Sequence, residues 1–327
     1  MLRIGLIGAG NMGSKHARIL RTMHEEGKCK FTACCDLVKN RAESALGDIE
    51  GKKYTNFEEM LEKESLDGII IATPTAEHMK MSLRAIEKGI NVLVEKPVTI
   101  EIEGSRKIYE ESKKAGVIVE AGMVEVFNSV VTNLVEMVRK RKLTLNTAIF
   151  NRFGFKTQKN DSKDMDVIHD LMIHDIAVAL ELLEYPELTL IGARALNLNE
   201  KSGFHDSASA FLTDGKSNIL FNASRSSEIK VRSFSMDFKE LYVQGNYMDQ
   251  KLNIFSSSKF EFTEAANNLW YNMAFDHTLA RYSNNPLYDE DLDFISAIES
   301  SREPKIGSDK WLLIMEVIDE IESQLFQ

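Results

Sequence analysis

An aspartate and a histidine lie four positions apart in Asp166 to Asp175, a segment with the composition of a helix. Residues at positions i and i+4 of a helix share a face, so Asp170 and His174 are expected to contact each other. Histidine exchanges a proton near neutral pH, and a neighbouring carboxylate fixes its tautomer and stabilises its cation. The pair is therefore a candidate general base, although such pairs are more often structural. His169 is expected to point elsewhere, because it lies five positions before His174.

Lys96 is the second candidate for chemistry, in the segment Glu95-Lys96-Pro97 that follows an apolar, strand-like run. A lysine desolvated at the end of a buried strand can bind a substrate hydroxyl, and its pKa can fall toward neutrality. An ion pair with Glu95 or a solvated loop charge explains the same residue, so the pattern leaves these alternatives open. Thr73 and Pro74 end the preceding strand-like run, and the two loops are expected to line one end of a cleft.

The N-terminal segment has the residues of a dinucleotide site, because a short apolar strand runs directly into Gly8-x-Gly10-x-x-Gly13 and then into a helix. The first glycine makes the tight turn, the second lets a pyrophosphate approach the backbone, and the third lets the helix pack closely. Asp36 follows Gly13 by 23 residues and can accept hydrogen bonds from ribose hydroxyls. The same carboxylate repels a 2′-phosphate, so NAD is expected over NADP, although Arg41 lies nearby. A carboxylate that merely ends a strand is the alternative.

The first third of the chain alternates apolar runs with amphipathic segments, which predicts a doubly wound parallel sheet of the α/β class. In such a sheet, ligands collect at the carboxyl ends of the strands. The expected strands are Leu2 to Ile7, Lys30 to Cys35, Gly68 to Ala72, Asn91 to Val94 and Val117 to Glu120, and the expected helices are Ser14 to Met23, Lys39 to Leu46, Phe57 to Lys63, Glu77 to Lys88 and Glu101 to Lys114.

The pattern changes after Gly122, which predicts a first domain of residues 1–122 and a second of residues 123–327. The second domain shows closely spaced short runs between Leu188 and Phe262, which indicate a large, mainly antiparallel sheet in an α+β arrangement. Helices are expected at Asn128 to Arg141, Asp166 to Leu183, Leu287 to Ser300 and Ser308 to Leu325. Because a broad sheet usually needs its exposed face covered, a homodimer or homotetramer is expected.

The amino-acid composition argues against several classes of binding partner. The formal net charge is −10, which opposes binding to nucleic acid or to an anionic membrane. The cysteines Cys29, Cys34 and Cys35 offer neither a chelating pair nor an easy disulfide, which favours a reducing, cytoplasmic home. No signal peptide or membrane segment is expected. No cluster of histidine, cysteine and carboxylate residues has a recognisable metal-binding spacing, so no metal is expected.

These motifs resemble a known family, the two-domain oxidoreductases typified by glucose-fructose oxidoreductase and myo-inositol dehydrogenase (the Gfo/Idh/MocA family). The resemblance extends over nearly the whole chain, from the glycine turn to the closing helices. It rests on Gly8 to Gly13 with His16, Ala72-Thr73-Pro74 with His78, Glu95-Lys96-Pro97, Phe127-Asn128, Asp170 with His174, and Pro286-Leu287 to Gly307-Ser308. The resemblance implies an NAD-binding Rossmann domain followed by a domain with an open antiparallel sheet used for substrate binding and oligomerisation.

The family also implies a catalytic set of Lys96, Asp170 and His174 that oxidises a secondary alcohol of a sugar-like substrate. His174 would act as the base, Lys96 would bind the reacting oxygen and Asp170 would orient the imidazole. We expect cofactor contacts from Gly8, Gly10, Asn11, Met12, Asp36, Arg41, Thr73, Pro74, His78, Glu95 and Lys96, and substrate contacts from Lys96, Glu125, Asn128, Arg152 and His174.

Within the family, the segments around Phe127 and His174 are most similar to the branch that oxidises UDP-N-acetylglucosamine-type nucleotide sugars at the 3-position. The chain departs from that branch at Val126, where many members have arginine, and at His169, where an aliphatic residue is usual. Arg152, on an expected strand, is a candidate for binding a diphosphate or a carboxylate, with a surface arginine as the alternative.

Two further histidines have structural explanations. His16 is expected to pack or cap rather than to catalyse, and His78 either approaches the nicotinamide or forms a hydrogen bond at a helix start. Two other functions remain open from the sequence: a non-catalytic NAD-binding regulator, and a relative that uses bound NAD for transient redox during glycoside cleavage or dehydration.

Overall fold

The computed structural model describes residues 1–155, 165–198, 203–265 and 268–325. The chain divides into two compact units, one of Met1–Phe127 with Asn285–Asp319 and the other of Asn128–Asn284 with Glu320–Gln327. This division differs from the expected boundary after residue 122, because helix α8 (Pro286–Ser300) and most of α9 (Ser308–Leu325) pack with the first unit. The sequence pattern shows where an element forms, but not which of two cores receives it.

The first unit is built on a six-stranded parallel sheet in the order β3-β2-β1-β4-β5-β6, which confirms the expected Rossmann fold. The strands are β1 (Arg3–Ile7), β2 (Lys30–Cys35), β3 (Lys52–Tyr54), β4 (Gly68–Ile71), β5 (Asn91–Glu95) and β6 (Val119–Gly122). The helices of this part are α1 (Asn11–Glu25), α2 (Lys39–Leu46), α3 (Phe57–Lys63), α4 (Thr75–Glu87) and α5 (Ile102–Ala115). The short strand β3 has no counterpart among the predicted runs, since Lys52 and Lys53 are exposed and charged.

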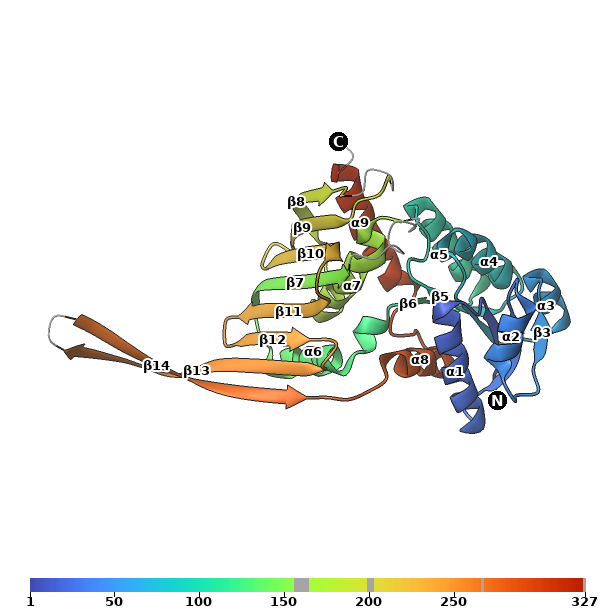
Figure 1. The fold of residues 1–327 in the computed structure, drawn as a ribbon, viewed down its shortest axis with the longest axis horizontal. Coiled ribbons are helices and arrows are strands. Elements are labelled where there is room, and N and C mark those ends of the chain that lie inside the picture. The colour runs from blue at the N-terminus through green and yellow to red at the C-terminus, as the bar shows by residue number, and fades with distance from the viewer. Residues whose placement is uncertain (156–164, 199–202, 266–267, 326–327) are drawn as a thin grey trace. The chain divides into compact units, whose positions relative to one another are not determined.

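Helices cover both faces of this sheet (Figure 1). One face packs against α1, α2 and α8 around buried residues that include Leu20, Phe31 and Phe294. In Figure 1, α4 and α5 lie over the opposite face. Strands buried on both sides explain why Ile69, Ile70 and Ile71 form a continuous apolar run with no accessible surface.

The register of the parallel strands brings the loops at their carboxyl ends together. Ile7 pairs with Ile71, Ile71 pairs with Val94, and Glu95 pairs with Gly122. The loop after β1, the loop after β4 and the loop after β5 therefore lie at one edge of the sheet, where a doubly wound fold binds its ligand.

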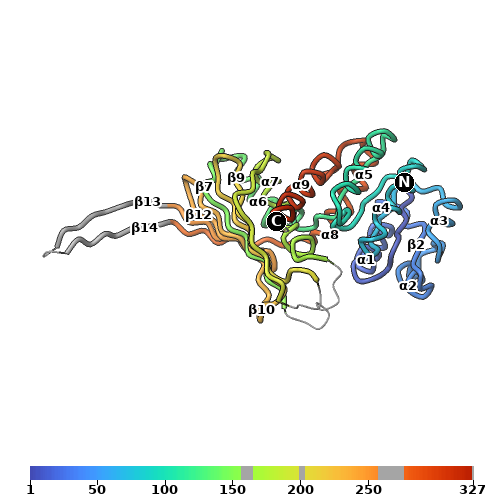
Figure 2. Tube along the Cα trace, turned by 90° about the horizontal axis from the view of Figure 1, so that it is seen from above, coloured from blue at the N-terminus to red at the C-terminus, as the bar shows by residue number. Residues whose placement is uncertain are grey.

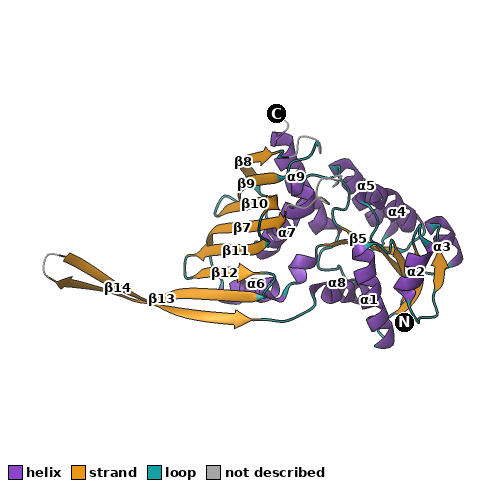
Figure 3. Ribbon diagram, viewed as in Figure 1, coloured by secondary structure: helices purple, strands orange, loops and turns teal. Residues whose placement is uncertain are grey.

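The second unit contains an eight-stranded sheet in the order β14-β13-β12-β11-β7-β10-β9-β8, and only β7 and β10 pair in parallel. The strands are β7 (Leu145–Phe155), β8 (Thr189–Leu196), β9 (Ser207–Thr213), β10 (Asn218–Ser227), β11 (Val231–Phe238), β12 (Tyr242–Asn246), β13 (Lys251–Ala265) and β14 (Asn268–Arg281). This confirms the expected large, mainly antiparallel sheet. Figure 2 shows α6 (Ser129–Arg141) and α7 (Ile173–Leu182) on one face of it, and Figure 3 separates these helices from the strands by colour.

Among the described residues, no helix is both long and apolar enough to cross a membrane.

Candidate active site

The glycine turn between β1 and α1 has a distinct geometry at each of its three glycines. Gly8 has a φ of +87°, and a Cβ there would lie 2.6 Å from the carbonyl oxygen of Ala72. A Cβ on Gly13 would lie 1.9 Å from the carbonyl oxygen of Gly8, whereas a Cβ on Gly10 would meet nothing within 4 Å. Gly8 and Gly13 therefore allow close packing, and the space beside Gly10 is open to a ligand.

The N-terminus of α1 suits an anion. Gly10 is its N-cap, no side chain caps it, and its first turn carries no acidic residue. The first N–H groups of a helix need acceptors, and the helix dipole favours negative charge there. A pyrophosphate fits both conditions, so the residues present fit a dinucleotide. Asn11 is exposed and Met12 half-buried at this position.

Asp36 is nearly buried at the end of β2 and holds the glycine turn in place. One carboxylate oxygen accepts a hydrogen bond of 2.8 Å from the backbone N–H of Ala9, and the other accepts one of 2.8 Å from that of Val38. A cavity of about 360 Å³ lies beside this turn, and Arg41 lines it together with Ser14, Arg18, Arg21, Asn40 and Ser44. Asp36 therefore favours the free ribose hydroxyls of NAD, whereas the arginines that line the cavity favour the 2′-phosphate of NADP.

We predict that NAD binds more tightly than NADP, and that Asp36→Ser narrows or reverses this preference. Losing charge-assisted hydrogen bonds to the ribose weakens NAD binding about 10- to 100-fold. Removing the negative charge lets Arg41 and Arg18 attract a 2′-phosphate, so NADP binding improves. Isothermal titration with both cofactors measures this, with Asp48→Ser as an exposed control. Equal affinities of the unchanged protein for the two cofactors would contradict the prediction.

The loops after β4 and β5 are tied together by His78. Its Nδ1 lies 2.9 Å from the carbonyl oxygen of Pro97, and its Nε2 lies 2.9 Å from that of Thr73. Burial lowers the pKa of His78, although its hydrogen bonds to the two carbonyl oxygens favour the cation. This geometry matches the hydrogen-bonding role that the sequence left open for His78. Thr73 and Lys96 are half-buried beside it and Pro74 is exposed, and the Lys96–Pro97 peptide bond is cis.

Asp170 and His174 belong to a helix that starts in an unexpected form. Ile168–Met172 is a π-helical turn that continues into α7, where the sequence predicted one α-helix. Asp166 starts it by accepting a hydrogen bond of 3.2 Å from the N–H of Ile168. Such π turns often occur at functional sites, because the wider turn changes how side chains are presented.

Exposure singles out the same two residues. From Asp166 to Leu182, only Asp170 and His174 are half-buried, and every other residue is buried. A polar side chain on a buried helix normally points into a satisfied contact, whereas these two also reach solvent-accessible space. This is the arrangement that a proton-transfer pair requires.

Arg152 is buried and paired with a carboxylate. Its side chain is 1% exposed, its Nε and Nη2 each lie 2.8 Å from a carboxylate oxygen of Asp175, and its guanidinium lies 5.0 Å from the ring centre of Tyr247. Arg152 is thus not a surface residue. The buried bidentate ion pair joins strand β7, which carries Arg152, to the start of α7, where Asp175 follows His174. We therefore leave Arg152 out of the proposed substrate site.

Asn128 is also used structurally, because its amide oxygen accepts from the N–H of Val130 at 3.1 Å and its amide nitrogen donates to the carbonyl of Tyr247 at 3.1 Å. It caps α6 and is 4% exposed. Glu125 is half-buried in the short 3₁₀ helix Val124–Phe127 and stays a candidate. His169 is buried and lies 3.0 Å from Glu322, which accounts for the histidine at that position.

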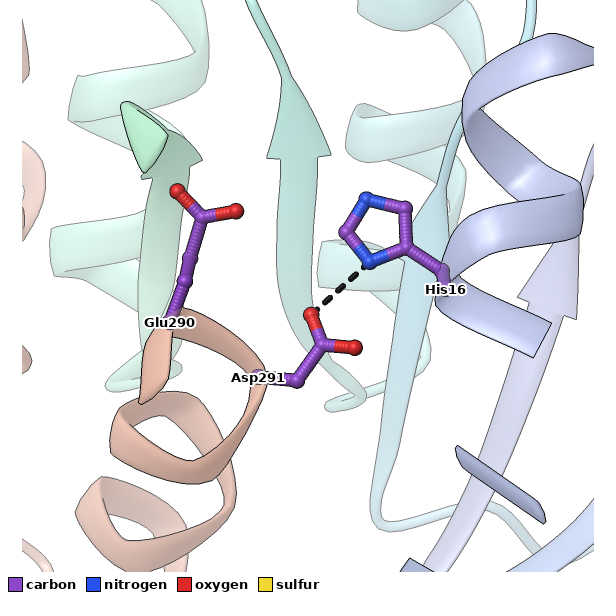
Figure 4. Close-up of side chains that lie close together, drawn as sticks. All are labelled: His16, Glu290 and Asp291. Atoms are coloured by element: carbon purple, nitrogen blue, oxygen red, sulfur yellow. Dashed lines mark hydrogen bonds and ion pairs between the residues drawn. The ribbon is translucent and has the colours of Figure 1, made fainter. Parts of the chain in front are cut away.

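A buried acidic cluster around His16 is the feature that the sequence missed. His16 on α1 lies between Glu95 of β5 and Asp291 of α8, with Nε2 3.0 Å from Glu95 and Nδ1 2.8 Å from Asp291. Figure 4 shows His16 with Asp291 and Glu290. The cue for α8 was present, because Glu290 and Asp291 fall on the same helical face as Leu287 and Phe294.

Burial and charge set the proton affinities in this cluster. Burial alone would lower the pKa of His16, but Asp291 and Glu95 raise this pKa well above its usual value. Burial raises the pKa of Glu290 and of Glu120 well above the usual range, and the Glu290 carboxylate has no hydrogen-bond partner among the described residues. Burial thus favours the neutral, protonated form of both acids.

Stability should accordingly depend on pH through Glu290. A raised pKa means that the folded protein keeps a proton that the unfolded chain loses above about pH 4.5. Stability from this group therefore falls as pH rises toward the folded pKa, by about 1.4 kcal/mol per pH unit. We predict that Glu290→Gln removes this slope. From pH 5 to pH 8, the urea-unfolding free energy of the variant should therefore rise relative to that of the unchanged protein. Parallel curves, as expected for the exposed control Glu50→Gln, would contradict the prediction.

The cysteines are unsuited to chemistry. Cys29, Cys34 and Cys35 are buried and unpaired. Burial raises the pKa of Cys29 and Cys34 to about 12 and that of Cys35 to about 11, so none forms a nucleophilic thiolate near neutral pH.

Known proteins share both the first unit and the whole fold. Residues 2–123 match the family model described as "Oxidoreductase family, NAD-binding Rossmann fold". Scyllo-inositol 2-dehydrogenase (NAD(+)) of Bacillus subtilis (strain 168) is 34% identical over 128 residues, which are 39% of this chain and 37% of that protein. Inositol 2-dehydrogenase 4 of Saccharopolyspora erythraea is 32% identical over 63% of this chain and 61% of its own length. The matches thus cover less than two thirds of either relative.

The solved structure of UDP-N-acetylglucosamine 3-dehydrogenase from Acidithiobacillus ferrooxidans has the same fold, with a TM-score of 0.81, 20% identity, and coverage of 99% of this chain and 97% of that one. An open glycine turn at an uncapped helix, on a parallel sheet of this strand order, is the arrangement found in dinucleotide-binding proteins. The first unit is thus similar to the oxidoreductase family with an NAD-binding Rossmann fold.

Proposed function

We propose that this protein is an NAD-dependent dehydrogenase that oxidises a secondary alcohol of a sugar or cyclitol. The first unit would hold the cofactor and the second unit the substrate. The observation that carries the proposal is that Asp170 and His174 are the only half-buried residues of an otherwise buried helical segment. The family of the first unit and the names of the two inositol dehydrogenases support the reaction class.

Three side chains would bind the reacting oxygen of the alcohol and accept its proton. His174 takes the hydroxyl proton of the alcohol, and Asp170 orients the imidazole and stabilises its cation. Lys96, half-buried at the end of β5, donates a hydrogen bond to the reacting oxygen and favours its developing negative charge. Bound NAD would supply the hydride acceptor. The alcohol carbon thereby loses a hydride and its oxygen loses a proton, which leaves a ketone.

Residues beside the glycine turn would hold the cofactor. The N-terminus of α1 would bind the pyrophosphate, with Gly8, Gly10, Asn11 and Met12 forming the turn, and Asp36 would bind the ribose. The loop residues Thr73, Pro74, Glu95 and Lys96 would lie on the nicotinamide side, with His78 joining the two loops.

A nucleotide sugar oxidised at the 3-position is the finer substrate that we propose. The shared fold with UDP-N-acetylglucosamine 3-dehydrogenase is compatible with it, whereas the inositol dehydrogenases favour a cyclitol. Glu125 remains the further candidate for a substrate contact.

The decisive assay incubates the purified protein with NAD and UDP-sugars, free sugars or cyclitols, and follows absorbance at about 340 nm, where only the reduced nicotinamide absorbs. We expect one of these classes to give steady NADH formation. A protein that binds NAD but reduces it with none of them would contradict the proposal and favour a regulator. Substrate turnover without net NADH would indicate transient redox instead.

We also propose a homodimer or homotetramer formed through the eight-stranded sheet, in the cytoplasm. Strands of that sheet carry exposed large apolar side chains, including Ile191 and Leu196 on β8, Tyr242 on β12 and Leu279 on β14. Light scattering on the purified protein measures the mass, and a monomer at micromolar concentration would contradict this part.

A further inference from the structure

Lys96 is linked through its neighbour to a buried chain of polar contacts. The backbone N–H of Lys96 donates to Glu95 Oε2 at 3.2 Å, and Glu95 Oε1 lies 3.0 Å from His16 Nε2. His16 Nδ1 lies 2.8 Å from Asp291 Oδ1, as Figure 4 shows. His16 and Asp291 have no accessible surface, and Glu95 is 7% exposed. The chain therefore runs from the interior of the first unit to the residue that we place at the reacting oxygen.

The hydrogen-bonding geometry favours one arrangement of protons. Both ring nitrogens of His16 face carboxylate oxygens, and an imidazole can donate to two acceptors only as the imidazolium. Its two partners are then ionised, so His16 is a buried cation between two buried anions. The pKa of His16 is raised and that of Glu95 is lowered against the effect of burial, whereas burial raises the pKa of Asp291 although His16 lowers it.

The other charged groups around the cluster complete the balance. Glu290 of α8 and Glu120 of β6 interact electrostatically with the cluster. Asp293 of α8 and Arg302 after α8 interact with Glu120, and the Cys29 thiol before β2 interacts with Asp291. Because burial favours the protonated form of Glu120 and Glu290, the charges to be balanced are those of Glu95 and Asp291. The His16 imidazolium and the Lys96 ammonium, which interacts with Glu95, balance them. Removing one of these charges leaves a buried charge without its partner.

A metal ion is the competing explanation. His16, Glu290 and Asp291 bring potential ligand atoms within 4.8 Å of one another. A metal needs a lone pair on the imidazole, however, and both nitrogens of His16 already face hydrogen-bond acceptors. The hydrogen bonds thus favour a proton-filled cluster over a metal site.

We propose that His16 is a positioning residue for Lys96: its imidazolium keeps the Glu95 carboxylate ionised, and that carboxylate holds the backbone of Lys96 at the strand end. This inference rests on the role proposed for Lys96. When the imidazolium is lost, two buried carboxylates remain together, and one of them takes up a proton. A protonated Glu95 accepts a weaker hydrogen bond from the Lys96 N–H, so the backbone of Lys96 is held less firmly. A displacement of about 1 Å at a reacting group can cost about 100-fold in rate.

Three variants separate positioning from general support of the fold. His16→Asn removes the cation, and we expect kcat to fall about 10- to 100-fold, with NAD affinity changed less than about threefold. The acid limb of the kcat profile should move up by about one pH unit or more, because Glu95 then titrates at higher pH. The double variant, which carries both His16→Asn and Asp291→Asn, restores part of the charge balance and should recover part of the lost kcat. Asp291→Asn alone keeps the His16–Glu95 pair and should leave the acid limb in place.

A folded His16→Asn protein with an unchanged kcat and pH profile would overturn the proposal. Equal changes of kcat in all three variants would also overturn it, because they would indicate structural support alone. If His16→Asn does not unfold cooperatively, Glu95→Gln tests the same link: we expect the same loss of kcat, and an unchanged rate contradicts the proposal. A thermal stabilisation by Mg²⁺ or Zn²⁺ that His16→Asn abolishes would replace the proton-filled cluster with a metal site.

A second measurement decides the case even if no substrate is found and the proposed function fails. Reductive methylation with ¹³C labels Lys96, and Lys96→Arg assigns its resonance. We expect this resonance to move in His16→Asn near pH 6 and to return toward its original position in the double variant. An unmoved resonance overturns the link between His16 and Lys96 independently of turnover.

Discussion

Replacing Lys96 with methionine is expected to lower kcat by about 10³-fold or more while NAD affinity changes by less than about fivefold. Methionine keeps the length and the apolar stem of the side chain but cannot donate to the reacting oxygen. Losing one preorganised donor to a developing oxyanion costs about 10² to 10³ in rate, and losing its positive charge adds to that cost. Steady-state assays of NADH formation, with NAD binding followed by titration calorimetry, measure both quantities.

Lys107→Met is the matched control, because Lys107 is exposed on α5 and takes no part in the proposed site. It should leave both kcat and NAD affinity as they are. A Lys96→Met protein with a rate within threefold of the unchanged enzyme would contradict the role assigned to this lysine.

Replacing His174 with asparagine is expected to lower kcat by about 10²- to 10⁴-fold, the range for loss of a general base. The pH profile of kcat/KM should also lose the limb that reports this base. Asp170→Asn should reduce the rate less, by about tenfold to 100-fold, because the base remains and only its orientation and charge stabilisation suffer. Rates measured from pH 5 to pH 10 with both variants test the two roles separately.

His277→Gln serves as the control for this pair, since His277 is exposed on β14 and its Nε2 lies 3.0 Å from the amide oxygen of Asn253, to which it donates. It should not alter the profile. If His174→Asn retains both limbs of the profile, the proton goes to another group and the assignment is wrong.

The sequence predicted the first sheet well because its signals are local. Continuous apolar runs mark buried parallel strands, and the glycine turn marks the start of α1. Strand β3 was missed because its only apolar anchor is Tyr54, next to two exposed lysines. The placement of α8 with the first unit was missed as well, because amphipathic periodicity shows that a helix has a buried face but not which core that face joins.

Long-range pairing also limited the prediction of the site. The pairing of Arg152 with Asp175 joins residues 23 apart, and that of His16 with Asp291 joins residues 275 apart. Neither contact has a spacing that a motif could reveal. The π turn at Ile168–Met172 was equally hidden, because its residues have ordinary helical periodicity. Exposure, which the sequence does not show, separates Asp170 and His174 from the buried His169.

The most direct test of the central claim, that Lys96 and His174 act on the same alcohol group, is a double-mutant cycle on the rate of hydride transfer. Single-turnover absorbance measurements would compare Lys96→Met, His174→Asn and the double variant, all saturated with NAD and substrate. Groups that act as a unit show strongly non-additive losses, so the double variant should be slowed little beyond the slower single variant. Losses that multiply in full would show that the two side chains act independently and would contradict the claim.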